Sequence, residues 1–220
     1  QKNRAVLDII VDMFPVSAKV GALALAWAIL VGVPLGCLAA FKRGKLTDSI
    51  LRVICTLGIS MPSFVVASVL LVTLTGNNAL NLFPSIFDPS QGWRAYVLPC
   101  FALGFYPMCY TARQTRSAML DSLSQEYIKT ARAKGLKNKK IIFKHALRNA
   151  LIPVITYLGP QVAFTLCGGF VVESVFSIPG LGRYFVQSIQ NRDYPVIMGT
   201  TIFLAAFIIL MNLVVDFLYK

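Results

Sequence analysis

Long apolar stretches alternate with short polar connections along this chain of 220 residues. A helix needs about 20 apolar residues to cross the hydrocarbon core of a bilayer, and five stretches approach or reach that length. The pattern therefore predicts an all-α integral membrane protein with five membrane-spanning helices, at about 18–41, 51–75, 96–112, 150–172 and 196–218.

Prolines in two of these stretches bear directly on the predicted spans. One contains Pro62 between Ser60 and Ser63, and the other contains Pro99, Gly104 and Pro107. A proline frees a backbone carbonyl, which a membrane helix tolerates where neighbouring groups or water satisfy it. We expect a kink at Pro62, and two interpretations are open: the kink serves helix packing alone, or Ser60, Pro62 and Ser63 line a translocation pathway.

Composition agrees with a membrane protein, because 56% of the residues are apolar and only 14% are charged. The charges also predict an orientation, since Lys and Arg accumulate in cytoplasmic loops. Fifteen of the 21 basic residues fall on one side of the predicted helices, and ten of them lie in the insert 113–148. That side, which includes the C-terminus, is predicted to be cytoplasmic, so the net charge of +12 reflects membrane topology.

Residues 1–17 form a lead-in ahead of the first predicted span. Their apolar positions would make the stripe of a short amphipathic helix, comprising Val6, Leu7, Ile10, Val11 and Phe14. Five spans and a cytoplasmic C-terminus place this lead-in outside, although it carries no apolar signal region. We therefore expect that an upstream first span is missing and that 18–220 is the transmembrane domain.

The basic insert 113–148 is too polar for hydrocarbon and must lie in water. Ser122 and Gln125 have the spacing of a capping box, which predicts a helix that runs from there to about Lys134 and ends at Gly135. Asn138 is a candidate cap for a second helix that leads into the next span. The insert is thus predicted to be a helix, a glycine turn and a helix.

On the first of these helices, Ile128 and Ala131 share one face and basic residues cover the rest. Such a helix, held between two spans, is a candidate docking surface for an ATPase that passes motion into the membrane. A second interpretation stays open, in which the basic cluster only sets topology or rests on anionic lipid head groups.

Several motifs resemble the ABC importer permeases of the peptide/nickel branch. The run 127–136, followed by 145–153, is similar to the cytoplasmic EAA loop of these permeases. Five further motifs agree in order and extend the resemblance over about 32–216: Gly32–Gly36, Ser60–Phe64, Pro179–Arg183, Arg192–Pro195 and Asn212–Asp216. Departures from the broader EAA consensus, at Lys129, Thr130, Ala131 and Arg148, resemble the peptide branch.

The resemblance implies the fold of a type I ABC importer transmembrane domain and a transport subunit without enzymatic activity. It implies a second, non-identical permease subunit, two ATP-binding subunits that hold ATP and magnesium, and an external substrate-binding protein or lipoprotein. The chain has no GxxxxGK[ST] motif, so nucleotide binding must come from the partners. The implied coupling surface comprises Glu126, Tyr127, Lys129, Thr130, Ala131, Arg132, Ala133, Lys134, Gly135 and Leu136.

The predicted function is to pass di- or oligopeptides across the cytoplasmic membrane. A permease for nickel or another small solute is an alternative, because the same motifs would serve it. An ion-coupled carrier or channel is a further alternative, but such a protein needs carboxylates or unwound polar segments at mid-membrane. The middles of the predicted spans contain no carboxylate, and the single histidine, His145, lies in the basic insert.

The external loop 173–195 mixes apolar residues with Gly and Pro. It is either a short re-entrant segment or an ordinary ordered turn. Glu173 lies near the outer end of its span, where a carboxylate is costly unless it is paired or hydrated. Three roles are open for Glu173: it lines the outer vestibule, it pairs with Arg183, or it contacts a peptide amine.

No metal site is predicted. The five cysteines lack CxxC spacing and are interpreted as packing residues in or beside the spans: Cys37, Cys55, Cys100, Cys109 and Cys167. His145 lies between Lys144 and Arg148, and neighbouring cations disfavour metal binding there.

Overall fold

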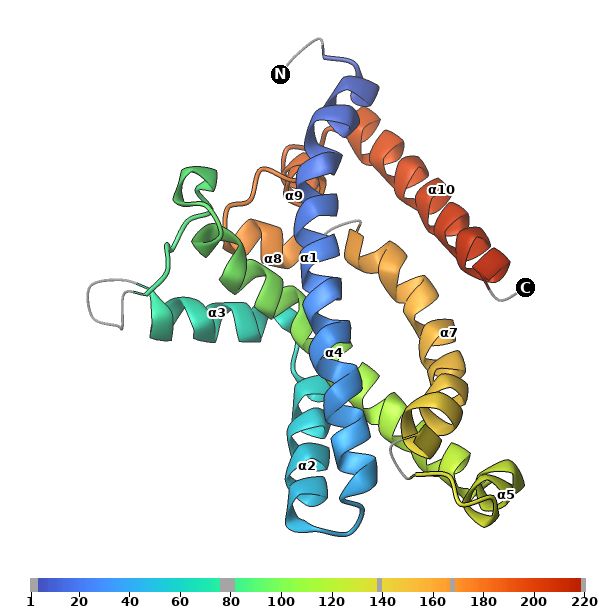
Figure 1. The fold of residues 1–220 in the computed structure, drawn as a ribbon. Coiled ribbons are helices and arrows are strands. Elements are labelled where there is room, and N and C mark those ends of the chain that lie inside the picture. Colours follow the sequence, from blue (N-terminus) through green and yellow to red (C-terminus); the bar gives the residue numbers. More distant parts are fainter. Residues whose placement is uncertain (1–3, 76–81, 138–139, 167–168, 219–220) are drawn as a thin grey trace. The chain divides into compact units, whose positions relative to one another are not determined.

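The structure is a computed structural model that describes residues 4–75, 82–137, 140–166 and 169–218 (Figure 1). All regular secondary structure in these residues is helical, which confirms the predicted class. The elements are α1 (Val6–Phe41), α2 (Leu46–Ser60), α3 (Ser63–Leu74), η1 (Pro89–Gln91), α4 (Arg94–Ser124), α5 (Glu126–Ala133), η2 (Ile141–Ala146), α7 (Leu147–Leu166), α8 (Phe170–Val175), α9 (Leu181–Gln190) and α10 (Tyr194–Leu218).

Among the described residues, three stretches are long and apolar enough to cross a membrane: α1, Ile141–Val175 and α10. The pair α2 and α3 meets the same criterion only when the two are counted together. The remaining predicted span, 96–112, lies in α4. This helix is long enough at 31 residues but is not among these candidates. Prolines, tyrosines and a polar second half lower the hydropathy of α4. The helix nevertheless continues through Pro99 and Pro107 without a break.

The lead-in predicted over 1–17 is not a separate helix, because α1 starts at Val6 and continues to Phe41. The predicted apolar stripe is confirmed only in part: Val6, Ile10 and Phe14 pack in the cluster with α9 and α10. Ile9 and Ile10 are buried, whereas Leu7 and Val11 are 69% and 62% exposed. The reason is tertiary: this part of α1 packs against α9 and α10, whose apolar residues select the face that is buried.

The chain forms two compact units, and each is described by itself. Unit 1 comprises Gln1–Ala26, Met61–Tyr106 and Gly159–Lys220, and unit 2 comprises Trp27–Ser60 and Pro107–Leu158. Three long helices, α1, α4 and α7, contribute a segment to each unit.

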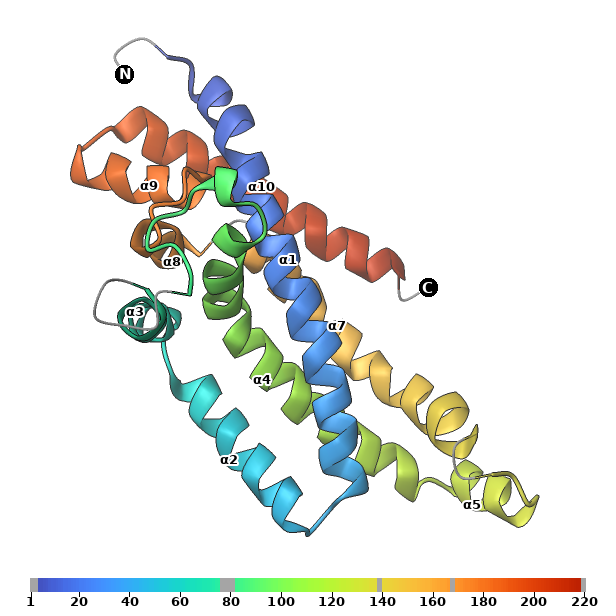
Figure 2. The same cartoon turned by 60° about the vertical axis from the view of Figure 1, so that its left-hand side comes forward.

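In unit 2, α1 and α4 cross in close contact (Figures 1 and 2). A Cβ atom at Gly32 would lie 2.8 Å from the carbonyl oxygen of Met108, and one at Gly36 would lie 2.6 Å from Cβ of Thr115. Any side chain at these positions would push the backbones apart. Gly32 and Gly36 therefore form the small-xxx-small contact that lets membrane helices pack closely.

α1 and α2 are joined by the tight basic turn 42–45. Gly44 has φ of +76°, a left-handed conformation that glycine adopts without strain, and its N–H donates to Oδ2 of Asp48 at 3.0 Å. After α2, the chain leaves helical geometry at Met61 and α3 begins at Ser63, with Pro62 in an extended conformation at its N-terminus. The predicted irregularity at Pro62 is confirmed, as a full break rather than a kink.

Unit 1 has its apolar contacts around α8, α9 and α10. Phe14 of α1 lies between Phe203 and Phe207 of α10, with ring centroids 5.0 Å apart in each pair. Ile10, Leu181 and Leu204 are the buried residues of this cluster. Aromatic pairs and buried aliphatic residues thus join the start of α1 to α9 and α10.

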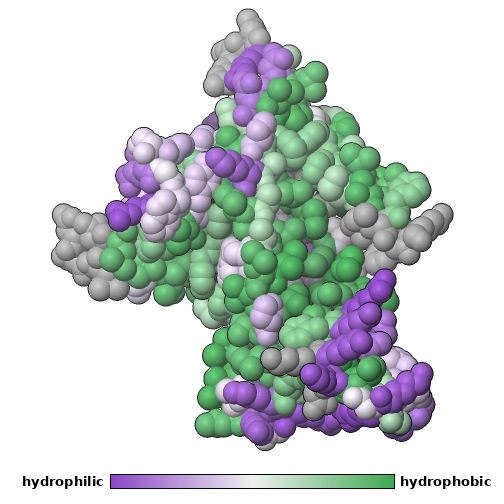
Figure 3. Space-filling view, in the orientation of Figure 1, coloured by the Kyte–Doolittle hydropathy of each residue, from purple (hydrophilic) through white to green (hydrophobic). Residues whose placement is uncertain are grey.

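The surface of unit 2 has a polar end and an apolar face. Figure 3 shows hydrophilic side chains gathered over the lower end of unit 2, where the turn 42–45 and α5 lie, and apolar side chains over the outer face of α2. The exposed residues of that face are large and apolar, including Ile50, Val53, Ile54 and Leu57. An exposed apolar band beside a basic rim is typical of a membrane protein at the level of the lipid head groups.

Candidate functional site

The predicted docking helix is present as α5, Glu126–Ala133. It begins one turn later than predicted, because α4 extends to Ser124 and Gln125 occupies the extended cap position with φ −72° and ψ 152°. No side chain caps this end. Glu126 in the first turn and Arg132 in the last turn match the polarity of the helix dipole.

Ser122 is not the helix cap that its spacing suggested. It is buried in the last turns of α4, and its hydroxyl lies 2.6 Å from the hydroxyl of Tyr127 and donates to the carbonyl oxygen of Ala146 at 3.0 Å. One serine thus joins α4, α5 and η2. Its sequence context gave no sign of this role, because the three elements meet only in the folded chain.

The turn after α5 has the glycine geometry that the sequence predicted. Gly135 has φ of +73°. Its N–H donates to the carbonyl of Arg132 at 2.9 Å, and the N–H of Leu136 donates to the carbonyl of Ala131 at 3.3 Å. This pair of bonds is the Schellman motif, in which a left-handed residue closes the helix end. A Cβ at Gly135 would have no atom within 4 Å. The positive φ of this residue, rather than a lack of space, is therefore what favours glycine here.

One face of α5 is held by the rest of unit 2. Ile128 is fully buried and Ala131 is 7% exposed. They belong to an apolar cluster with residues of α1, α4, η2 and α7: Ala40, Ala118, Met119, Ile141, Ala146 and Ala150. The shared face predicted for Ile128 and Ala131 is confirmed. Ala131, which was expected on the partner surface, packs in this cluster.

The other predicted coupling residues lie on the open side of the helix. Glu126, Tyr127, Lys129, Thr130, Arg132, Ala133, Lys134 and Gly135 are all exposed, and Leu136 is half-buried against the cluster. Nζ of Lys129 lies 2.7 Å from Oε1 of Glu126, in an exposed pair one turn apart. The exposed surface of α5 therefore carries small residues, cations and one acid, and its apolar face is buried against unit 2.

The second helix of the insert joins the membrane helix directly. Residues 141–146 form the π-helical turn η2, which continues without a break into α7. The predicted cap, Asn138, lies outside the described residues. Pro153 lies within α7. The apolar cluster and the Ser122 hydroxyl therefore connect α5 to η2, which continues into α7.

The loop 173–195, which was predicted to be external, contains a buried carboxylate. Glu173 is 1% exposed, and its Oε2 accepts the backbone N–H of Arg183 at 3.0 Å. The Arg183 guanidinium group instead donates to the carbonyl of Ser177 at 2.7 Å, so the predicted ion pair between these side chains does not form. Ser17 of α1 accepts the N–H of Leu181 at 2.8 Å. Glu173 and Ser17 together satisfy the first backbone donors of α9.

Gly180 has no side chain, which lets Glu173 and Ser17 approach the start of α9. A Cβ at Gly180 would overlap Oε2 of Glu173 and would lie 2.5 Å from Oγ of Ser17. Because α8 and α9 are separate short helices held by these bonds, the external loop is an ordered helical hairpin and not a simple turn.

The two serines near Pro62 belong to different units. Ser60 is exposed, and its hydroxyl donates to the carbonyl of Thr56 at 3.0 Å, which satisfies a carbonyl near the break. Ser63 lines a cavity of about 560 Å³ in unit 1, with residues of α7 to α10 that include Phe164, Phe170 and Phe185. Within the described residues, no group of three or more His, Cys, Asp or Glu side chains could hold a metal ion. Cys167 lies outside them.

The sequence matches the family described as "Binding-protein-dependent transport system inner membrane component" over residues 32–220. The "Dipeptide transport system permease protein DppB" of Bacillus subtilis (strain 168) is 47% identical over 98% of this chain and 68% of its own length. The "Oligopeptide transport system permease protein OppB" of Haemophilus influenzae is 42% identical over 99% and 71%. A crystal structure of an amino acid ABC transporter with histidines has the same fold, with a TM-score of 0.67, 18% identity and coverage of 96% of this chain and 91% of that one.

Proposed function

Because the chain belongs to the family of binding-protein-dependent transport system inner membrane components, we propose that it passes di- or oligopeptides across the cytoplasmic membrane. The chain is a multi-pass membrane component of an ABC importer, and partner ATPases hydrolyse the ATP. The peptide class is supported by the names of its relatives, which are dipeptide and oligopeptide permeases at 42–47% identity. The nickel and ion-coupled alternatives have no comparable support.

The observation that carries the mechanistic part of this proposal is the construction of α5. One face is fixed by Ile128 and Ala131, the end is closed at Gly135, and the opposite face is exposed. We propose that this exposed face, with Tyr127, Lys129 and Arg132 among its residues, docks into a cleft of an ATPase subunit. Closure of the ATPases would then move α5, and η2 would pass the movement to α7.

The assembly is proposed to contain a second, non-identical permease, two ATPase subunits that bind ATP and magnesium, and an external binding protein. The C-terminus is proposed to be cytoplasmic, on the same side as α5 and the turn 42–45. Native mass spectrometry of the purified transporter measures the stoichiometry. Two copies of this chain without a homologous partner would contradict the heterodimer.

The pathway is proposed to pass the irregular segment at Pro62. The support is the cavity lined by Ser63, and Ser60 and Pro62 at the helix break. Glu173 and Arg183 are proposed to brace the outer mouth through the hydrogen bonds of α9, with no contact to substrate. A cysteine at Ser63, in a background without native cysteines, should react with a water-soluble thiol reagent in a nucleotide-dependent way. If this cysteine is fully protected in every nucleotide state, the break at Pro62 serves helix packing alone.

Uptake by the complete transporter in proteoliposomes tests the function. A labelled dipeptide should accumulate with ATP and the binding protein, and it should not accumulate when the partner ATPases cannot hydrolyse ATP. Nickel ions offered in the same preparation should not accumulate. Nickel uptake without peptide uptake would show that nickel, and not a peptide, is the substrate.

A further inference from the structure

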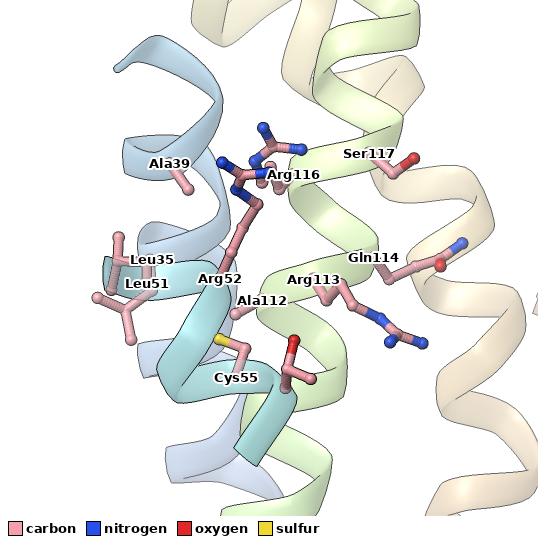
Figure 4. A pocket seen from close by; sticks show the side chains of 11 residues that line it. Leu35, Ala39, Leu51, Arg52, Cys55, Ala112, Arg113, Gln114, Arg116 and Ser117 are labelled. Atoms are coloured by element: carbon pink, nitrogen blue, oxygen red, sulfur yellow. The ribbon is translucent and has the colours of Figure 1, made fainter. Parts of the chain in front are cut away.

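Unit 2 contains a cavity of about 370 Å³ between the end of α1, the middle of α2 and the second half of α4 (Figure 4). Its walls combine two kinds of side chain. The apolar part includes Leu35, Leu51 and Cys55, and the cationic part comprises Arg52, Arg113 and Arg116. A ligand for this cavity therefore has both apolar and anionic parts.

The cavity has more positive than negative charge. Asp48, which is 1% exposed, accepts Nε of Arg116 at 2.7 Å and Nη2 of Arg116 at 2.9 Å, and Nε of Arg52 lies 3.6 Å from the same carboxylate. Arg113 extends over the ring of Tyr110 with Cζ 5.5 Å from the centroid. None of the residues that line the cavity is acidic. Two guanidinium groups thus share one carboxylate, and Arg113 adds a third positive charge to the lining.

The arrangement of the two arginines at one end of the cavity suits a phosphate group. Figure 4 shows the guanidinium groups of Arg52 and Arg116 side by side, and Arg113 on the next turn of α4 directed elsewhere. The bidentate bond to Asp48 fixes Arg116, while the Arg52 side chain is 53% exposed. Planar guanidinium groups bind phosphate oxygens through paired N–H donors.

The surroundings indicate that the phosphate belongs to a lipid. The turn 42–45 next to the cavity carries three basic residues, and the lining of the cavity itself includes Leu35 and Leu51. In a membrane protein these features place the opening at the level of the head groups, with apolar side chains inside the cavity for the start of an acyl chain. Basic pockets between membrane helices on the cytoplasmic side bind anionic head groups.

We propose that this cavity binds an anionic phospholipid of the cytoplasmic leaflet, with Arg52 and Arg116 at the phosphate and Arg113 adding to the positive field. The leaflet follows from the orientation given under Proposed function, and lipid binding itself does not depend on the transported substrate. A lipid seated here joins α1, α2 and α4 at the membrane surface.

The experiment is a lipid titration of the complete transporter, in neutral phosphatidylcholine nanodiscs, with phosphatidylglycerol as the probe and native mass spectrometry as the readout. Arg52→Gln should bind phosphatidylglycerol about fivefold more weakly, which corresponds to about 1 kcal/mol for one charge. The matched control, Arg43→Gln, removes the same charge from the adjacent turn and should bind as the unmodified chain does. Arg52→Gln leaves the Asp48–Arg116 pair intact. Unchanged peptide uptake by this variant in proteoliposomes shows that it is folded.

Three outcomes would overturn the proposal. Equal losses in Arg52→Gln and Arg43→Gln would mean that diffuse surface charge attracts the lipid. Equal retention of phosphatidylcholine and phosphatidylglycerol would mean that charge has no part. Displacement of the lipid by inorganic phosphate or by a free dipeptide would assign the cavity to a soluble anion.

Discussion

α5 and α9 are both short helices in connections between longer ones, yet they are held in opposite ways. α5 is seated by two apolar residues, Ile128 and Ala131, and keeps most of its surface exposed. α9 is fixed at its first turn by hydrogen bonds to the buried Glu173 and to Ser17. Apolar burial and one serine hydroxyl hold α5 to the cluster of unit 2 and leave its other face open, whereas buried hydrogen bonds to backbone donors specify one geometry for the start of α9. The comparison suggests that α5 transmits movement and that the α8–α9 hairpin is a fixed part of its unit.

The largest expected effect is at the end of α5. Gly135→Val forces a β-branched residue to adopt φ near +73°, at a cost of about 1–3 kcal/mol. We expect ATP hydrolysis to continue while peptide uptake falls about tenfold or more, because 1.4 kcal/mol corresponds to a factor of ten. Gly135→Asn is the control, because asparagine tolerates the left-handed region. Coupled uptake at the normal rate in the valine variant would show that the turn does not control α5.

The second effect concerns the fixed hairpin. Glu173→Ala removes the acceptor for the N–H of Arg183, and an unsatisfied buried donor costs about 1–3 kcal/mol. The thermal unfolding midpoint of the purified complex should fall. Glu173→Gln retains an oxygen acceptor and should have a smaller effect. If the alanine variant unfolds at the same temperature as the unmodified complex, the carboxylate does not hold α9.

A smaller change is expected at Ser122, whose hydroxyl is a polar contact that seats α5. Ser122→Ala removes hydrogen bonds with Tyr127 and Ala146 and should lower stability by about 1 kcal/mol. Ser124→Ala is a matched control two residues away, because its exposed hydroxyl bonds only the carbonyl of Asp121. Thermal unfolding of both variants measures the difference. Equal midpoints would mean that the apolar cluster alone seats α5.

The smallest effect on stability is expected on the open face of α5. Lys129→Ala breaks the exposed pair with Glu126, and such pairs contribute less than about 1 kcal/mol. The unfolding midpoint should barely move, while binding of the ATPase subunit to this chain should weaken. Glu126→Ala breaks the same pair and serves as the control for stability. A loss of stability as large as that of Ser122→Ala would contradict a free docking face.

The sequence could indicate much of the coupling region because its signals are local. Gly135 follows a helical pattern and can take positive φ at low cost, and the spacing of Ile128 and Ala131 places them on one face. Long apolar stretches likewise indicate helices whatever their neighbours are. The family motifs extended this reading to nearly the whole chain, and the comparisons agree with it.

The sequence could not indicate how distant residues meet. Ser122 and Gln125 fit a capping box, but the burial of Ser122 against Ala146 favoured the continuation of α4. An ion pair between Glu173 and Arg183 was one role expected from the sequence. In the structure the carboxylate instead accepts a backbone N–H at the start of α9. The face of α1 that is buried was chosen by α9 and α10, and the bond between Asp48 and Arg116 joins residues 68 positions apart. Local sequence thus determined the helices, the glycine turn and the exposed charges, whereas tertiary packing decided which polar groups became partners, because a buried donor or acceptor must find whichever partner the fold brings within reach.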